Sequence, residues 1–233
     1  MNLLLLSSSR AGDSDYLAPA LDLIAAQLAE RREVLFVPYA GVTVSYDDYQ
    51  QKVQAALKPL GLKVTSIHQF ADTKQALQQA QAVMVGGGNT FALLQRLYQH
   101  DLVEDLRQLV LQGLPYTGWS AGSNIAGLSI RTTNDMPIIE PPSFQALGLL
   151  PFQLNPHYAN FAPPGFHGET RDMRIAEFMQ LNPDTPVVGL PEGTALKLVS
   201  GKLSYVGNSD AALFQRGVKS VIAPDSDLSA LLI

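Results

Sequence analysis

The sequence predicts an α/β fold: a mostly parallel sheet with helices on both faces and antiparallel strands at its edge. Through the first 130 residues, short continuous apolar runs alternate with amphipathic stretches, which is typical of buried parallel strands joined by helices. Towards the C-terminus, strand-like runs follow one another across short glycine-containing connections, which indicates antiparallel hairpins. Since no linker-like run interrupts the chain, we expect residues 1–233 to form one domain.

The strands of the first half share a short apolar run bounded by polar or turn-forming residues. They are expected at 3–6, 33–38, 62–67, 82–85 and 114–119. The stretches between them carry apolar residues at helical spacing. These helices are expected at 16–30, 46–60, 73–80, 89–98 and 102–112, and a helix of small residues at 121–128.

The pattern changes after Ile130, where proline-rich loops with short strands are expected up to residue 167. This segment is either a mobile cover or a rigid wall, and the sequence allows both. A helix is predicted at 169–180. Further strands are predicted at 187–190, 195–199, 202–206, 212–215 and 218–222.

Composition excludes several classes of function. The net charge is −5 and no run of Lys or Arg occurs, so nucleic-acid binding is not expected. The chain has no cysteine, which excludes disulfides, a cysteine nucleophile and thiolate metal sites, and fits a cytoplasmic location. No apolar run approaches the roughly 18 residues that span a bilayer, so no membrane association is expected. No metal-binding motif is present, and we expect neither metal nor cofactor.

The stretch Gly118-Trp119-Ser120-Ala121-Gly122 reads Gly-x-Ser-x-Gly, between an expected strand and an expected helix. In that context, a sharp turn exposes a serine hydroxyl, and the flanking glycines permit a strained backbone. The following N–H groups begin a helix and are suited to stabilising an oxyanion. Ser120 is therefore a candidate nucleophile, and the alternative is an ordinary tight turn.

Two other segments are expected at the same sheet edge, where ligands of open α/β sheets bind. One is the glycine run 86–88, which opens a helix at Asn89, and the other is 190–194. The glycine N–H groups are candidates to form an oxyanion hole with the N–H of Ala121. A phosphate cradle and close helix–strand packing are the alternatives.

A serine nucleophile requires a base, and the chain has four histidines. His68 and His100 lie at the ends of early elements and are interpreted as surface or structural residues. His157 follows an apolar run, as a loop leaving a strand, and is preferred. His167, in a glycine-flanked loop, remains the second candidate.

The orienting acid depends on the order of the three residues along the chain. If the acid precedes the histidine, as in α/β-hydrolases, Asp135 and Glu140 are the candidates. If it follows, Glu192 is the natural choice, because it comes after an apolar strand and lies between a proline and a glycine. Arg171 and Arg174, in the first turns of the 169–180 helix, are either anion-binding residues or part of a solvated face.

Four segments together resemble the peptidase E family, the α-aspartyl dipeptidases. They are Gly-Gly-Gly-Asn-Thr-Phe (86–91), Gly-Trp-Ser-Ala-Gly-Ser (118–123), Asn-Pro-His-Tyr (155–158) and Leu-Pro-Glu-Gly-Thr (190–194). The resemblance covers essentially the whole chain in order and spacing. It implies a doubly wound α/β fold similar to class I glutamine amidotransferase domains, and a serine hydrolase of dipeptides with an N-terminal aspartate.

The resemblance also implies roles for single residues. Ser120 becomes the nucleophile, His157 the base and Glu192 the acid, with Arg171 binding the substrate's aspartate side chain. Gly88 and Ala121 are then expected to supply the oxyanion hole. Asp135 remains either a supporting residue just outside the site or an alternative to the acid, and Asn89 is a candidate supporting residue.

The expected ligands are thus small aspartyl dipeptides, and the chain is expected to be a monomer or a small homo-oligomer. Two alternatives remain. One is a related hydrolase of another aspartyl linkage, like the cyanophycin-degrading relatives, and the other is a non-catalytic binding protein of the same fold.

Overall fold

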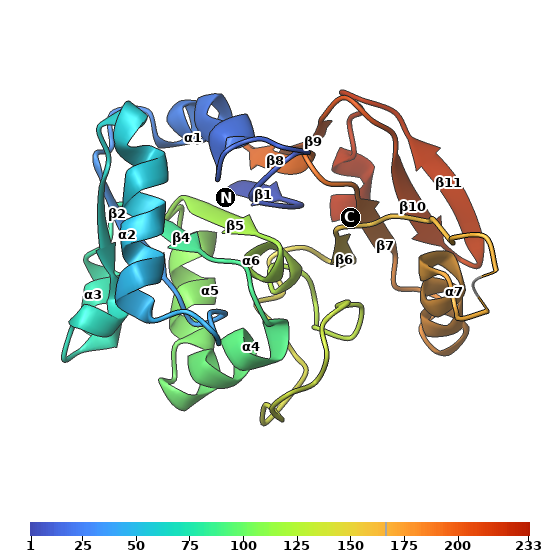
Figure 1. Cartoon of the computed structure of the whole chain (residues 1–233), viewed down its shortest axis with the longest axis horizontal. Coiled ribbons are helices and arrows are strands. Elements are labelled where there is room, and N and C mark those ends of the chain that lie inside the picture. Colours follow the sequence, from blue (N-terminus) through green and yellow to red (C-terminus); the bar gives the residue numbers. More distant parts are fainter. Residues whose placement is uncertain (166) are drawn as a thin grey trace.

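The computed structural model describes residues 1–165 and 167–233, and its larger sheet has the strand order β3-β2-β4-β5-β1-β8-β9 (Figure 1). These strands are β1 (Asn2–Leu6), β2 (Glu33–Val37), β3 (Lys63–Ser66), β4 (Val83–Val85), β5 (Tyr116–Trp119), β8 (Ala195–Val199) and β9 (Lys202–Val206). The first five are parallel to one another, whereas β8 pairs antiparallel with β1 and with β9. The predicted mostly parallel sheet with antiparallel edge strands is confirmed.

Helices cover both faces of this sheet, as its apolar runs predict. On β1, Leu4 and Leu6 pack in one cluster with α1 (Leu21–Leu28) and α2 (Tyr46–Leu57). Leu3 and Leu5 belong to the cluster on the other face, which holds α3 (Thr73–Gln78), α4 (Thr90–Gln99), α5 (Val103–Leu111) and α6 (Ala121–Asn124). Because successive side chains of a strand point to opposite faces, the four consecutive leucines of β1 supply both faces of the sheet with apolar side chains.

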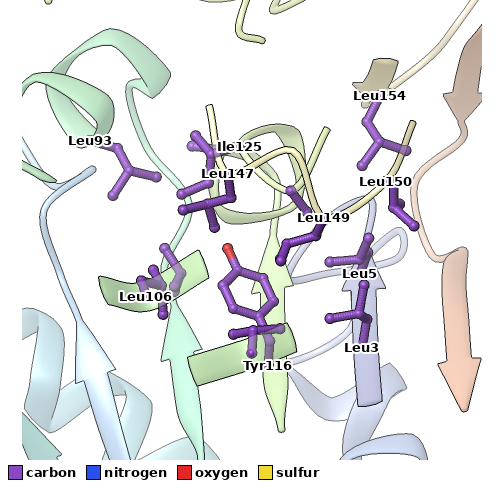
Figure 2. Packing of buried hydrophobic residues seen from close by; sticks show 14 of the residues in the cluster. Leu3, Leu5, Leu93, Leu106, Tyr116, Ile125, Leu147, Leu149, Leu150 and Leu154 are labelled. Carbon is purple, nitrogen blue, oxygen red and sulfur yellow. The ribbon is translucent and has the colours of Figure 1, made fainter. Parts of the chain in front are cut away.

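Figure 2 shows the second of these clusters around Tyr116, with Leu3 and Leu5 of β1 beside it. The Tyr116 side chain is fully buried, and its hydroxyl donates a 2.5 Å hydrogen bond to the Gly122 carbonyl oxygen. The base of β5 is thereby tied to the turn at its carboxyl end.

A four-stranded sheet, in the order β11-β10-β7-β6, stands beside the larger one. Its strands are β6 (Gln153–Pro156), β7 (Val187–Leu190), β10 (Ala211–Gln215) and β11 (Val218–Ile222), and β6 and β7 run parallel. Helix α7 (Arg171–Leu181) packs on this sheet through Ile175 and Met179. The predicted β8–β9 and β10–β11 hairpins are confirmed.

Three predictions of local structure differ from the structure. The helix expected at 121–128 ends at Asn124, because the backbone beyond it forms hydrogen bonds with the irregular segment 144–152 instead of continuing the helix. The segment 190–194 follows β7, which belongs to the smaller sheet, so the three candidate segments do not share one sheet edge. The helix expected at 16–30 is shorter, with a 3₁₀ turn at Ala18–Ala20 before α1.

Candidate active site

Ser120 lies at a sharp turn between β5 and α6, with φ 53° and ψ −112°. Residues other than glycine rarely adopt this backbone conformation, and those that do cluster at functional sites. The flanking glycines have a steric reason: a Cβ on Gly118 would lie 2.4 Å from the Gly122 carbonyl oxygen, and one on Gly122 would lie 2.1 Å from that of Val85. The motif therefore lets the turn pack directly against β4.

The glycine run 86–88, which follows β4, packs against this serine. A Cβ on Gly87 would lie 3.0 Å from the Ser120 Cβ, and Gly88, at φ 137°, would place one 2.2 Å from the Ala40 carbonyl oxygen. Among the described residues, the N–H groups of Gly88 and Ala121 have no hydrogen-bond acceptor. Since α6 is only four residues long, it offers the free N–H group of Ala121 rather than a substantial helix dipole.

His157 follows β6 directly, at φ 54°, and its ring joins two of the predicted residues. Its Nε2 lies 3.0 Å from the Ser120 Oγ, and its Nδ1 lies 2.7 Å from the Glu192 Oε1. With Glu192 ionised, Nδ1 carries the hydrogen and donates to the carboxylate, so Nε2 is free to accept from the serine hydroxyl. The structure thus brings Ser120, His157 and Glu192 together.

Ser7, which belongs to none of the sequence motifs, connects the two sheets at this point. Its fully buried hydroxyl donates to the Leu190 carbonyl oxygen at 2.7 Å and accepts the His157 backbone N–H at 2.9 Å. Its own N–H donates to the Thr194 carbonyl oxygen. The end of β1 in the larger sheet therefore positions the loops that carry His157 and Glu192.

One side of the Ser120 hydroxyl opens into a 210 Å³ cavity, which we call the Arg171 pocket. It is lined by Thr90, Ser120, Ala121, Asn124, Thr133, Asn134, Asp135, Pro156, His157 and Arg171. The Nη1 of Arg171 is buried and has no hydrogen-bond partner among the described residues. Burial is the main cause that lowers the pKa of Arg171 from its ordinary value, and the positive charge of the neighbouring Arg174 is the second. An unpartnered guanidinium nitrogen in a pocket is suited to binding an anion.

Arg171 is held beside the loop that carries His157 by a contact between the residues that follow them, Asp172 and Tyr158. The Tyr158 hydroxyl donates a 2.5 Å hydrogen bond to Asp172, whose other oxygen accepts from Lys219 at 2.7 Å. Helix α7 is therefore tied both to the loop that carries His157 and to β11.

Asp135 and Asn89 both contact the start of α4. The Asp135 Oδ2 accepts the Thr90 N–H at 2.7 Å, and Asn89 caps the helix by accepting the Ala92 N–H at 3.0 Å. The Asn89 amide also donates to the Met136 carbonyl oxygen. Asp135 lines the Arg171 pocket, whereas the contacts of Asn89 tie the segment after residue 131 to α4.

The other side of Ser120 faces a larger cavity of 610 Å³, the Lys52 pocket. It is lined by Ser9, Tyr16, Ala40, Gly41, Val42, Thr43, Val44, Tyr49, Lys52, Gly87, Gly88, Asn89, Trp119, Ser120, Ile138 and His157. Lys52 lies 4.2 Å from the centroid of the Tyr16 ring. A hollow of 820 Å³ at the opposite end of the strands holds none of the predicted site residues, and ligands of such sheets bind at the carboxyl ends.

The remaining candidates lie elsewhere. His68 bonds to Ser66 and Asp47, and His100 stacks on Tyr39 at the end of α4.

Glu140 and His167 are exposed and line neither pocket. Arg174 is exposed and pairs with Glu169 at 3.5 Å. Of the segment 131–167, Phe166 lies outside the described residues.

No helix in residues 1–165 or 167–233 has the length and apolar character needed to cross a membrane. In the same ranges, no three His, Asp or Glu side chains gather as a metal site would require.

Comparison with known proteins gives a consistent result. Residues 3–206 match peptidase family S51. The chain is 54% identical to peptidase E of Shewanella amazonensis over 230 residues, which are 98% of each chain. It is 53% identical to peptidase E of Shewanella oneidensis, over 100% of this chain and 99% of that one. Among solved structures, a peptidase from an acI-B1 Actinobacterium has a similar fold, with a TM-score of 0.71, 15% identity, and coverage of 97% of this chain and 96% of the other.

Proposed function

The chain belongs to peptidase family S51, and we propose that it is a serine-type dipeptidase that hydrolyses dipeptides with an N-terminal aspartate. The observation that carries the substrate assignment is Arg171, whose unpartnered guanidinium nitrogen lies in the same small pocket as Ser120 and His157. A buried cation without a partner is unfavourable unless a ligand supplies the anion.

The proposed reaction begins at Ser120. Its Oγ attacks the carbonyl carbon of the aspartyl residue while His157 Nε2 takes the hydroxyl proton. The carbonyl oxygen becomes an oxyanion, which the free N–H groups of Gly88 and Ala121 stabilise. Glu192, bonded to Nδ1, stabilises the imidazolium that forms.

The tetrahedral intermediate then collapses, and the carbon–nitrogen bond breaks. His157 returns its proton to the departing amine, which leaves the aspartyl group esterified to Ser120. Water enters, gives a proton to His157 and attacks the ester. The ester bond then breaks as His157 passes that proton to the Ser120 Oγ, so that aspartate is released and the serine hydroxyl is restored.

The charges around Ser120 match those of an aspartyl dipeptide. In the Arg171 pocket, Arg171 binds the side-chain carboxylate, and Asp135 accepts the α-ammonium group. On the other side, the Lys52 pocket holds the leaving residue, and Lys52 attracts its C-terminal carboxylate. The apolar walls of this pocket, which include Val42 and Ile138, suit varied side chains on the second residue.

A substrate panel tests this proposal. Hydrolysis of Asp-Leu, Glu-Leu, Asn-Leu and β-linked Asp-Leu is followed by release of leucine. We expect turnover of Asp-Leu alone, and its abolition in Ser120→Ala. Turnover that survives Ser120→Ala contradicts the mechanism, whereas preference for the β-linked compound would assign the enzyme to another aspartyl linkage.

A further inference from the structure

We infer that Tyr49 is a positioning residue, whose hydroxyl holds the Gly87–Gly88 peptide with its N–H directed to the oxyanion. The inference rests on the proposed function, in which the Gly88 N–H is one of the two oxyanion donors. Tyr49 lies in α2, and its hydroxyl donates to the Gly87 carbonyl oxygen at 2.9 Å.

Peptide geometry links this bond to the donor. The Gly87–Gly88 peptide is trans and planar, so its C=O and N–H point in opposite directions. Because Tyr49 holds the oxygen on its own side, the Gly88 N–H faces away from Tyr49. Gly88 and Ser120 line the same pocket, and this N–H has no acceptor among the described residues.

A glycine run needs such an anchor. Glycine residues populate both signs of φ readily, so rotation of a peptide between two of them meets little steric resistance. If the Gly87–Gly88 peptide turned over, a carbonyl oxygen would replace the N–H and would repel the oxyanion. The neighbouring glycine also serves the anchor, because a Cβ on Gly86 would lie 2.5 Å from the Tyr49 hydroxyl oxygen.

Tyr49 is the last side chain of a hydrogen-bond chain with a single direction. The Trp119 Nε1 lies 3.0 Å from the Tyr16 hydroxyl, which lies 3.2 Å from the Tyr49 hydroxyl. A carbonyl oxygen only accepts and an indole N–H only donates. Each hydroxyl has one hydrogen, so Trp119 donates to Tyr16, Tyr16 to Tyr49, and Tyr49 to Gly87. Successive bonds of this kind polarise one another, which makes the Gly88 N–H a stronger donor.

The surroundings keep this chain intact. Burial raises the pKa of both Tyr16 and Tyr49, so both phenols retain their hydrogens at neutral pH. The Phe36 ring packs edge-on against the Tyr49 ring, with centroids 4.9 Å apart, and stacks on Trp119. The Tyr49 ring is therefore held by packing, and removal of its hydroxyl alone is a clean perturbation.

Tyr49→Phe tests the inference, with Tyr39→Phe as the matched control. The Tyr39 hydroxyl is also buried but has no partner among the described residues. Loss of a whole oxyanion donor costs on the order of 10²–10³-fold in kcat. For a donor that is misdirected part of the time, we expect Tyr49→Phe to lower kcat for Asp-Leu about 10- to 100-fold, with KM within about threefold.

The labelling rate of Ser120 by a fluorophosphonate probe gives a second readout, because its phosphoryl oxygen occupies the oxyanion site. We expect this rate to fall in Tyr49→Phe and to stay unchanged in Tyr39→Phe. A wild-type enzyme that reacts with the probe but not with Asp-Leu refutes the proposed substrate and leaves the role of Tyr49 to be judged by labelling. A folded Tyr49→Phe enzyme with wild-type kcat and labelling rate overturns the inference, as does an equal loss in Tyr39→Phe. If Tyr49→Phe does not fold, Tyr16→Phe decides: lower kcat at constant KM supports the inference, and unchanged kcat overturns it.

Discussion

Replacement of Arg171 by methionine separates substrate recognition from catalysis more directly than any change to the Ser120 turn. Methionine retains much of the arginine's aliphatic bulk but provides no charge and no hydrogen-bond donor. The variant leaves the contact between Ser120 and His157 in place. We therefore expect it to lose discrimination between Asp-Leu and Asn-Leu rather than the ability to form an acyl-enzyme.

The magnitude follows from the state of the guanidinium. A hydrogen bond that involves a charged group contributes about 1.5–3 kcal/mol. Two such bonds to the substrate carboxylate contribute about 3–6 kcal/mol, which corresponds to roughly 10²- to 10⁴-fold in kcat/KM. In the free protein, Arg171 Nη1 is already buried and has no partner in residues 1–165 or 167–233, so its desolvation adds nothing to the cost of binding. We thus expect Asp-Leu to lose at least about 10²-fold in kcat/KM, and Asn-Leu to change by less than about tenfold.

Steady-state kinetics with both dipeptides measure this change, and thermal unfolding provides a second readout. Arg171 Nη1 has no partner among the described residues, and burial, followed by the charge of Arg174, lowers the pKa of the guanidinium. We therefore expect the melting temperature of Arg171→Met to equal or exceed that of the wild type. Arg174→Met is the control, since Arg174 lies one turn further along α7, is exposed and pairs with Glu169. An unchanged ratio of Asp-Leu to Asn-Leu turnover in Arg171→Met would refute the assignment.

Three other substitutions test separate parts of the site. Gly88→Ala would place a methyl group 2.2 Å from the Ala40 carbonyl oxygen at φ 137°, so we expect a loss of at least about 100-fold in kcat; a value within tenfold of the wild type contradicts this. Ser7→Ala removes a buried hydroxyl that accepts the His157 N–H, and should lower the free energy of unfolding in urea by about 1–3 kcal/mol. An unchanged midpoint of urea unfolding would show that the hydrogen bonds of the Ser7 hydroxyl do not stabilise the packing of the two sheets. Lys52→Met should raise KM about tenfold for Asp-Leu but leave that for Asp-Leu amide unchanged, and an equal effect on both argues against a carboxylate contact.

The sequence predicts the elements of this fold well, because their apolar patterns report burial directly. Strands buried on both faces, such as β1, read as continuous apolar runs whatever their neighbours are. Ser120 is identifiable because two glycines flank it, where a larger side chain would not fit, and because an apolar strand precedes the motif. Glu192 is harder: the residues alone allow acids on either side of the histidine, and only the resemblance to peptidase E selects one.

What the sequence does not predict depends on contacts between distant segments. A serine after a strand, like Ser7, carries no signal that it bridges two sheets. Tyr49, Val53 and Leu57 recur every four residues and bury one face of α2, so the tyrosine reads as an ordinary core residue. The small residues after Asn124 suit a helix, but hydrogen bonds to a distant loop override that propensity.

Several unfavourable features of the structure lie around the Ser120 hydroxyl. Ser120 and His157 both have positive φ, and such a conformation costs a non-glycine residue on the order of 1–3 kcal/mol. Arg171 has a buried nitrogen without a partner, and the N–H groups of Gly88 and Ala121 lack acceptors in the described chain. None of these features stabilises the fold, and all five residues line the two pockets that meet at the Ser120 hydroxyl. A bound aspartyl substrate would satisfy the guanidinium, and its transition state would satisfy the free N–H groups. The same features that weaken the free protein are therefore those that a hydrolase requires at its reacting centre.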